Sequence, residues 1–227
     1  MSSNPTFDLS SSGIPNAALF EGLSQDELNL VVSRASLREL PKGAFLFRQG
    51  EPASEMFLLE SGRARLHEIT RAGHELLIRF VRPGEVFGDK GAIPGSQYRA
   101  SAVSDTPVRI YAWTTAAMGM LIEELPRLAT NLFKIATQYS HYSRERYLLL
   151  ATASAEDRIH WAVAELARVF GSPQANATAI TGQAVQQDIA DLSVTTIYTV
   201  SRVLKSYEQK GILTKKRGRI LLFHPFE

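Results

Sequence analysis

The chain has 227 residues, enough for one or two domains with cores of their own, and its 44% hydrophobic and 21% charged residues are ordinary for a globular protein. Its net charge of +2 identifies no class of partner, but the absence of cysteine excludes disulfides, thiolate nucleophiles and Cys-ligated zinc or iron–sulfur centres. No apolar run reaches the roughly 18 residues of a membrane span, and Met1–Pro15 lacks the basic and apolar regions of a signal peptide. We therefore expect a cytoplasmic protein with no membrane partner, in which residues 1–15 form a disordered arm.

The first half of the chain has the pattern of a β-rich domain. A short helical pattern over residues 16–36 contains Ser24 and Glu27 at the spacing of a capping box. From Leu37 to Trp113, short apolar or alternating runs are separated by glycines, which is typical of an all-β sandwich or barrel. These runs span residues 44–47, 56–59, 64–69, 76–81, 101–103 and 108–113. The segments between them are too short for crossover helices, so a parallel sheet is not expected.

The stretch from Pro126 to Ala153 predicts one long helix, because no proline or glycine interrupts it after Pro126. Steps of four and three residues place a set of side chains on a single seam, as in paired helices. This seam consists of Leu128, Leu132, Ile135, Tyr139, Tyr142, Arg146 and Leu149. We interpret the seam as the interface of a homodimer. The alternative is an amphipathic helix that packs on its own domain.

The last third of the chain predicts a compact helical domain with a basic hairpin. Ser154 is a new N-cap and starts a second amphipathic helix. Gln187–Lys205 then predicts two short helices joined by a tight turn, which is a helix-turn-helix. Residues 212–214 and 220–223 predict two strands around the basic segment Lys215–Arg219, which suits contact with phosphates and makes the motif winged. The alternative is a helical hairpin with an ordinary solvated face.

Three segments together resemble the CRP/FNR family of bacterial transcription regulators, namely Pro41–Glu51, Pro83–Asp89 and Thr199–Lys205. The resemblance covers about residues 18–224 and implies an α+β chain in three parts. These are a cyclic-nucleotide-binding-like jelly-roll effector domain at 16–125, a dimerisation helix at 126–153 and a winged helix-turn-helix DNA-binding domain at 154–227. The resemblance further implies a homodimer that binds a roughly palindromic operator in double-stranded DNA, with RNA polymerase as a further partner.

The DNA-reading positions of the family fall at the start of the second helix of the motif. Arg202 matches the family arginine and is the candidate for a bidentate contact to guanine, the alternative being a phosphate contact alone. Tyr198 stands where the family often has a base-reading glutamate, so the usual operator half-site is not expected. The full expected set of DNA-binding residues is Thr196, Ile197, Tyr198, Ser201, Arg202, Lys205, Lys216, Arg217 and Arg219.

The effector site of the family corresponds to two short segments of this chain. In members that bind cyclic AMP, a Gly-Glu pair and an Arg-Ser pair at fixed spacing hold the ribose and the cyclic phosphate. Gly88-Asp89 and Arg99-Ala100 have that spacing, but Asp89 is shorter than glutamate and Ala100 has no hydroxyl. Ser101 comes one residue late, and in an extended segment this shift turns the hydroxyl to the opposite face. On the long helix, the adenine-contacting pair of the family falls at Ser143 and Arg144.

Several effectors therefore remain open. A cyclic nucleotide is one candidate; a second is haem in a gas-sensing (CO or NO) regulator, with His74 as its candidate ligand. A third alternative is a structural ion pair between Asp89 and Arg99 in a jelly roll that has lost its ligand. A cyclic-nucleotide-binding regulatory subunit that does not touch DNA would share the jelly roll but would not need residues 187–205. We expect no enzyme, because the sequence has no nucleophile–base motif, Gly-rich phosphate loop or metal-spaced His/carboxylate cluster.

Overall fold

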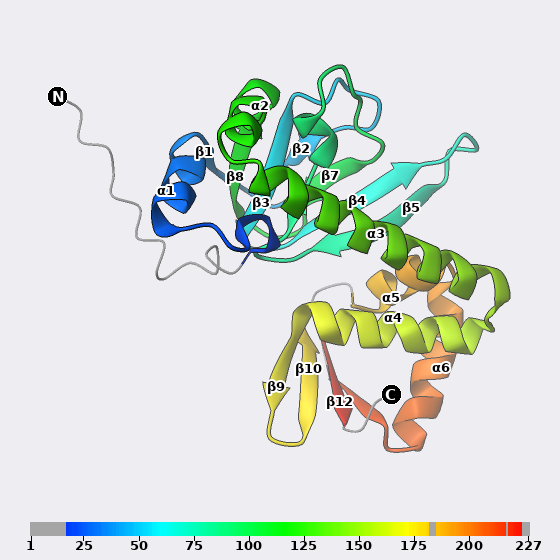
Figure 1. Ribbon diagram of the computed structural model, residues 1–227. Coiled ribbons are helices and arrows are strands. Elements are labelled where there is room, and N and C mark those ends of the chain that lie inside the picture. Colours follow the sequence, from blue (N-terminus) through cyan, green and yellow to red (C-terminus); the bar gives the residue numbers. More distant parts are fainter. Residues whose placement is uncertain (1–16, 182–184, 217, 224–227) are drawn as a thin grey trace. The chain divides into compact units, whose positions relative to one another are not determined.

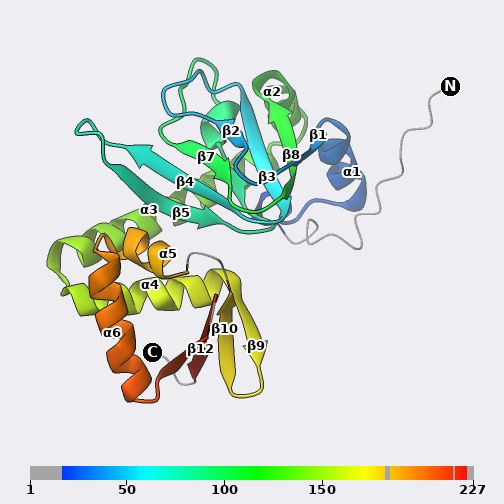
Figure 2. The same ribbon diagram turned by 180° about the vertical axis from the view of Figure 1, so that it is seen from behind.

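The computed structural model describes residues 17–181, 185–216 and 218–223, and Figure 1 and Figure 2 show it from two sides. The chain divides into two compact units between His141 and Tyr142, inside helix α3 (Arg127–Thr152). Residues from Tyr142 onward pack with helix α4 (Ala155–Phe170), as shown by the contact of 3.4 Å between Tyr142 Oη and Glu165 Oε1. The expected arm at 1–15 and the expected DNA contact of Arg217 lie outside the described residues.

The first unit is a jelly roll. Its described residues form two four-stranded antiparallel sheets, with strand orders β1-β8-β3-β6 and β2-β7-β4-β5. The strands are β1 (Ser36–Leu40), β2 (Phe45–Phe47), β3 (Glu55–Ser61), β4 (Ala64–Ile69), β5 (Glu75–Val81), β6 (Val86–Phe87), β7 (Ser101–Ser104) and β8 (Val108–Thr114). Apart from the hairpin β4–β5, sequence neighbours alternate between the two sheets, which is the order of two Greek keys folded into a jelly roll.

Strand β3 is buried on both faces, which explains why residues 56–59 form an unbroken apolar run. Phe57 and Leu59 point into the core between the two sheets. Met56 and Leu58 point to the other face and join a second core under the helices. The helical elements of this unit are η2 (Ala18–Phe20), α1 (Gln25–Ser33), η3 (Asp89–Ala92), α2 (Thr115–Glu124) and the first part of α3. The expected capping box at Ser24 is present at the start of α1.

The second unit is a winged helix-turn-helix. Helix α4 is followed by α5 (Val185–Ser193) and α6 (Ile197–Gln209). A four-stranded antiparallel sheet has the order β11-β12-β10-β9. Its strands are β9 (Gly171–Gln174), β10 (Ala177–Thr181), β11 (Leu213–Lys216) and β12 (Arg219–Phe223). The hairpin β11–β12 confirms the predicted wing, and α5 and α6 confirm the predicted pair of helices.

Helix α3 confirms the long helix predicted from the sequence, but its seam faces the chain itself. Leu128 is 0% exposed and Ile135 is 6% exposed, both in the core of the first unit, and Leu132 and Tyr139 pack against that core. Leu128 and Ile135 are therefore taken up by the core of their own unit and have little or no surface left for a partner, whereas the other seam residues are only partly buried. A 4-3 spacing of apolar residues describes an amphipathic helix on a flat core as well as a coiled coil.

The C-terminal part of the seam packs inside the second unit. Tyr142 lies 6.2 Å from Trp161 between ring centroids, and the Arg146 guanidinium lies 5.9 Å from the same ring. Leu149 is half-buried. No helix within the described ranges is long and apolar enough to cross a membrane.

A different face of α3 is open. Phe133, Thr137, Ser140, Arg144 and Tyr147 are all exposed, and they follow one another in steps of four and three residues. Its two aromatic members are largely open to solvent, Phe133 at 74% and Tyr147 at 70% exposed. We call these five residues the exposed stripe.

Candidate functional site

The two helices of the helix-turn-helix are held together by short apolar faces, as the sequence predicts. The buried side chains on these faces are Ile189, Ala190, Leu192, Val200, Val203, Leu204 and Tyr207. Because these positions are buried, the remaining face of α6 is left to solvent. The apolar pattern thus fixes which side of α6 can meet a ligand.

The turn between α5 and α6 is held by two arginines from the preceding helices. The carbonyl of Leu192 accepts a hydrogen bond of 3.2 Å from Arg146 Nη2, and the carbonyl of Val194 accepts one of 3.4 Å from Arg158 Nη1. Burial lowers the pKa of the Arg146 guanidinium. Val194 itself has φ of 50°, in the left-handed region that β-branched residues rarely adopt.

Helix α6 presents its first turns to solvent. Thr196 is the N-cap, and its Oγ1 accepts a hydrogen bond of 3.2 Å from the backbone nitrogen of Thr199. This cap supplies a partner for one of the free N–H groups at the helix start. Tyr198 is 77% exposed and Ile197 is 50% exposed, so two large side chains stand next to each other on the open side of the helix start.

The same face of α6 carries cations without partners. Ser201, Arg202 and Lys205 are exposed, as expected of DNA-binding residues. Within the described ranges, neither Arg202 nor Lys205 forms an ion pair. Both side chains therefore keep their full hydrogen-bonding capacity for a polyanion.

The wing is tied to the end of α6. Glu208 Oε1 accepts a hydrogen bond of 2.9 Å from the backbone nitrogen of Lys215, and Glu208 Oε2 lies 3.7 Å from Lys215 Nζ. The hydrogen bond from Lys215 lowers the pKa of the Glu208 carboxyl. Lys216 is exposed beyond this anchor, and Arg219, opposite it in the β11–β12 register, is half-buried. The wing thus holds basic side chains in a fixed relation to α6.

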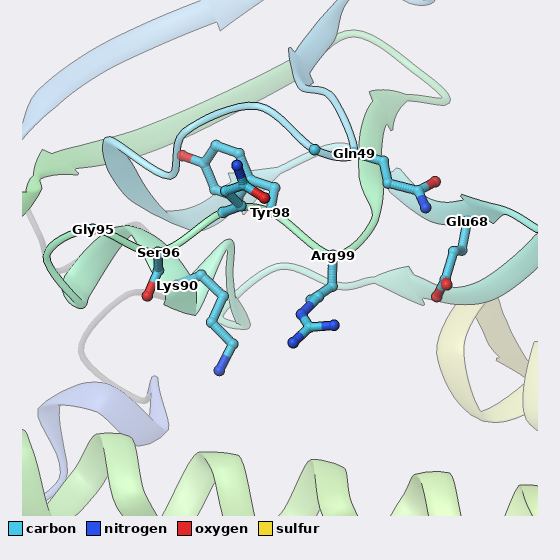
Figure 3. A pocket seen from close by; sticks show the side chains of 9 residues that line it. Gln49, Glu68, Lys90, Gly95, Ser96, Tyr98 and Arg99 are labelled. Carbon is cyan, nitrogen blue, oxygen red and sulfur yellow. The ribbon is translucent and has the colours of Figure 1, made fainter.

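A polar pocket lies in the first unit, at the segment where the family comparison places the effector. It has a volume of about 570 Å³, in the range of small-molecule sites. Figure 3 shows Lys90 and Arg99 reaching into the same side of this pocket, with Glu68 beyond Arg99. The residues that line it are Gln49, Gly50, Glu68, Lys90, Gly95, Ser96, Gln97, Tyr98 and Arg99.

Tyr98 in the pocket lining is held in place by contacts within the first unit. Tyr98 is 5% exposed, stacks on Phe47 with ring centroids 4.0 Å apart, and donates a hydrogen bond of 2.6 Å to the carbonyl of Glu55. Burial raises the pKa of the Tyr98 phenol. Tyr98 is buried while Arg99, the next residue, is exposed at the bend before β7.

The expected effector residues are only partly brought together. Arg99 lines the pocket, whereas Gly88, Asp89 and Ala100 are not among the residues that line it. Asp89 is exposed, and in the described part of the chain it forms no ion pair with Arg99. The structural ion pair considered as an alternative is therefore absent, and Arg99 is available to a ligand.

Ser101 does not replace the missing hydroxyl at position 100. It is 5% exposed, and its Oγ accepts a hydrogen bond of 3.0 Å from the backbone nitrogen of Gln49. Ser101 is not among the residues that line the pocket, although Arg99 and Ala100 form a bend rather than the extended segment that the sequence argument assumed. Lys90 is a charged pocket residue that the sequence analysis did not single out.

A hydrogen-bonded cluster joins the strand before this site to α3. Tyr139 Oη donates a hydrogen bond of 2.9 Å to the carbonyl of Val86, and Arg79 Nη2 donates one of 3.2 Å to the same oxygen. The Arg79 guanidinium also lies 4.2 Å from the centroid of the Tyr139 ring and pairs with Glu85 at 2.8 Å. Burial raises the pKa of Tyr139 to about 12.

The remaining predicted positions lie elsewhere. Ser143 and Arg144 are exposed on the part of α3 that belongs to the second unit. His74 is exposed in the turn between β4 and β5, and it is not among the residues that line the pocket. No structural observation therefore favours haem at His74. The described ranges contain no cluster of three or more His, Cys, Asp or Glu that could hold a metal ion.

The sequence matches two known domain families. Residues 37–124 match the Cyclic nucleotide-binding domain, and residues 146–225 match the Crp-like helix-turn-helix domain. These ranges contain the pocket and the exposed face of α6.

Similar proteins span nearly the same length as this chain. The Cyclic AMP receptor protein of Thermus thermophilus is 28% identical over 202 residues, which cover 89% of this chain and 90% of that protein. The Transcriptional activator protein anr of Pseudomonas aeruginosa is 27% identical, with 89% and 82% covered. Among solved structures, the c-di-GMP-responsive global regulator CLP of Xanthomonas campestris has the same fold, with a TM-score of 0.74 at 19% identity, covering 88% of this chain and 99% of that one.

Proposed function

The chain belongs to the CRP/FNR family of bacterial transcription regulators, and from this premise we propose that it is a homodimer that binds operator DNA under the control of a small effector. The observation that carries the proposal is the open face of α6, where Arg202 has no ion-pair partner among the described residues and Tyr198 is 77% exposed. We propose no catalytic activity for the chain, since its relatives are regulators of transcription.

In the proposed complex, α6 lies in the major groove of B-form DNA. Arg202 makes a bidentate contact to a guanine, and Tyr198 and Ile197 meet apolar base edges such as the thymine methyl group. Thr196, Ser201 and Lys205 contact bases or backbone beside them. Lys216, Arg217 and Arg219 of the wing contact phosphates, which position the protein without reading the sequence.

Binding of labelled duplex DNA at several salt concentrations tests the DNA-binding proposal. The logarithm of the association constant should fall linearly with the logarithm of the salt concentration, because phosphate contacts release counterions. Fluorescence anisotropy with a mixture of random duplexes measures this slope. If no duplex binds even at low salt, the DNA-binding proposal is wrong. That result would favour the alternative, a cyclic-nucleotide-binding subunit that does not contact DNA.

For the homodimer we propose the exposed stripe of α3 as the interface. Phe133, Ser140 and Tyr147 recur at every seventh residue, and Thr137 and Arg144 fall between them, which is the repeat of a two-stranded coiled coil. An isolated helix face with two aromatic side chains more than two-thirds exposed is costly in water and is stabilised when a second copy covers it.

For the control mechanism we propose that an effector in the pocket acts on α3 through the first unit. The cluster of Arg79, Glu85, Val86 and Tyr139 joins α3 to the strand that leads to Gly88-Asp89. An effector that shifts this strand changes the support of α3, and Ser143 and Arg144 are further effector contacts on that helix. The two α6 helices of the dimer then move into or out of a spacing of about 34 Å, one turn of DNA.

RNA polymerase is the further partner that we propose. One relative is described as a transcriptional activator, which supports a protein that recruits the polymerase at its operator. An in vitro transcription assay on a promoter that carries the selected operator separates activation from repression.

A further inference from the structure

The pocket of the first unit contains two cations with no partner of opposite charge. Lys90 comes from η3 and Arg99 from the segment before β7, and both line the pocket. Neither forms an ion pair within the described ranges. In Figure 3 the two side chains extend in the same direction, so that their nitrogen atoms lie on one side of the pocket.

The opposite side of the pocket has a different character. Glu68 lines it from β4 and likewise has no ion-pair partner among the residues described. Gln49 is oriented by the backbone of Ile69: its Nε2 donates a hydrogen bond of 3.2 Å to the carbonyl of Ile69, and its Oε1 accepts one of 2.8 Å from the nitrogen of Ile69. The pocket is therefore cationic at one end and anionic at the other.

The groups that suit a cyclic phosphodiester are missing or occupied. Ala100 has no hydroxyl, the Ser101 hydroxyl is taken by Gln49, and Asp89 does not line the pocket. A cyclic phosphodiester has a single negative charge, whereas the pocket has two cations side by side. Two neighbouring cations favour a ligand with two negative charges. A monoanion can neutralise only one of them, whereas a dianion can form an ion pair with each.

We propose that this pocket binds a small dianion, a phosphate monoester or a dicarboxylate, through Lys90 and Arg99, and that Glu68 accepts a hydrogen bond from a hydroxyl or ammonium group of the same ligand. This inference rests on the proposed effector function of the first unit. It names a ligand class that differs from cyclic AMP in charge. Arg99 supplies a planar fork of donors and Lys90 a compact charge, so together they fit two oxygen atoms of one ligand.

Two matched pairs of probes test the charge preference directly. Methyl phosphate and dimethyl phosphate differ by one negative charge at about pH 8, since the second pKa of a phosphate monoester is about 6. Succinate and its monomethyl ester differ in the same way. Each probe is titrated into the full-length protein, and the backbone amide signals of Gly95, Ser96 and Arg99 are followed in proton–nitrogen correlation spectra.

We expect at least one dianion to bind saturably and more tightly than its monoanionic counterpart. Its affinity should fall about twofold to fivefold in Lys90→Met, the effect of one exposed ion pair, and further in Arg99→Gln. Lys42→Met removes an exposed lysine that does not line the pocket and should leave the affinity unchanged. Whether methyl phosphate or succinate binds identifies the source of the dianion.

The proposal is overturned if neither dianion binds saturably, if each binds no better than its monoanionic counterpart, or if Lys90→Met has no more effect than Lys42→Met. A parallel titration with duplex DNA tests the proposed function independently. If the protein binds DNA but no dianion, the proposed ligand class is wrong and the proposed DNA-binding function stands.

Discussion

Tyr139 of α3 donates a hydrogen bond of 2.9 Å to the carbonyl of Val86, the first residue of β6. The same oxygen accepts a second hydrogen bond from Arg79, whose guanidinium lies over the Tyr139 ring. Because Val86 comes two residues before Gly88-Asp89, this contact ties the long helix to the segment next to the effector pocket. Tyr139 is therefore the residue through which we expect the β-domain to influence α3.

Replacing Tyr139 by Phe should destabilise the protein by about 0.5–1.5 kcal/mol, the usual cost of one hydrogen bond whose acceptor keeps another donor. Urea unfolding measures the change. We also expect the variant to weaken the effect of a bound effector on DNA affinity. Unchanged stability together with unchanged coupling would contradict the proposed role of Tyr139.

The raised pKa of Tyr139 gives a pH dependence of known sign. The pKa is about 12 in the folded chain against an ordinary value of 10.0, so the unfolded chain loses this proton first as pH rises. The free energy of unfolding should therefore fall between about pH 10 and 12, by up to about 2–3 kcal/mol from this group.

Urea unfolding of the wild type and Tyr139→Phe across that range isolates the contribution. Burial also raises the pKa values of Tyr98, Tyr111 and Tyr207, so the variant should keep a shallower slope rather than none. Identical slopes for the two proteins would show that Tyr139 titrates normally.

The two faces of α3 should respond differently to substitution. Tyr147→Glu or Phe133→Glu places a charge in the exposed stripe and should convert the dimer to monomers, as measured by sedimentation velocity. Gln138→Glu adds the same charge at an exposed position on another face of α3 and should leave the dimer intact. A Tyr147→Glu protein that remains fully dimeric would argue against the stripe as the interface.

Leu128→Ala tests the other face. Leu128 is fully buried in the core of its own unit, so its truncation should cost about 2–5 kcal/mol of stability. Sedimentation under native conditions should still give a dimer. A loss of dimer without a loss of stability would instead restore Leu128 to the interface.

Val194→Gly should stabilise the second unit, although it removes a side chain. A non-glycine residue in the left-handed region strains the folded chain by about 1–3 kcal/mol, and glycine removes this strain. Glycine also makes the unfolded chain more flexible, which lowers the free energy of unfolding by about 0.5–1 kcal/mol. Val194 is 44% exposed, so little packing is lost. Thermal unfolding of the wild type, Val194→Gly and Val194→Ala measures the change. Val194→Ala is the control, because it keeps the Cβ atom and hence most of the strain. A Val194→Gly protein less stable than the wild type would contradict the prediction.

Features with a strong local pattern were predictable from the sequence. The capping box at Ser24, the uninterrupted stretch after Pro126 and the paired apolar faces of the helix-turn-helix all have short-range causes. Strands β1 and β6 were not singled out, because β6 has only two residues and β1 alternates weakly. Strands β9 and β10 and helix α2 were also missed, although Thr114 caps α2 through a hydrogen bond of 3.2 Å from the backbone nitrogen of Ala117.

The faces of α3 and the composition of the pocket needed the structure. A 4-3 repeat is present on both the seam and the exposed stripe, and only the position of the core shows which repeat is covered by the chain itself. Lys90 was not predicted as a site residue, because it lies outside the two pairs, Gly88-Asp89 and Arg99-Ala100, that the resemblance points to. Its place beside Arg99 became apparent only from the pocket.

In the proposed complex, α6 reads the base sequence and the wing contacts the DNA backbone. A comparison of Arg202→Ala and Lys216→Ala separates these two roles; it uses an operator selected from random duplexes, with every base pair of the operator varied in turn. Arg202→Ala should relax the preference at one position by about 1–3 kcal/mol, whereas Lys216→Ala should weaken binding to all sequences alike and reduce the salt slope by about 1. If Arg202→Ala leaves both the affinity for DNA and the base preference unchanged, α6 does not recognise bases through Arg202, which contradicts the proposed mode of DNA binding.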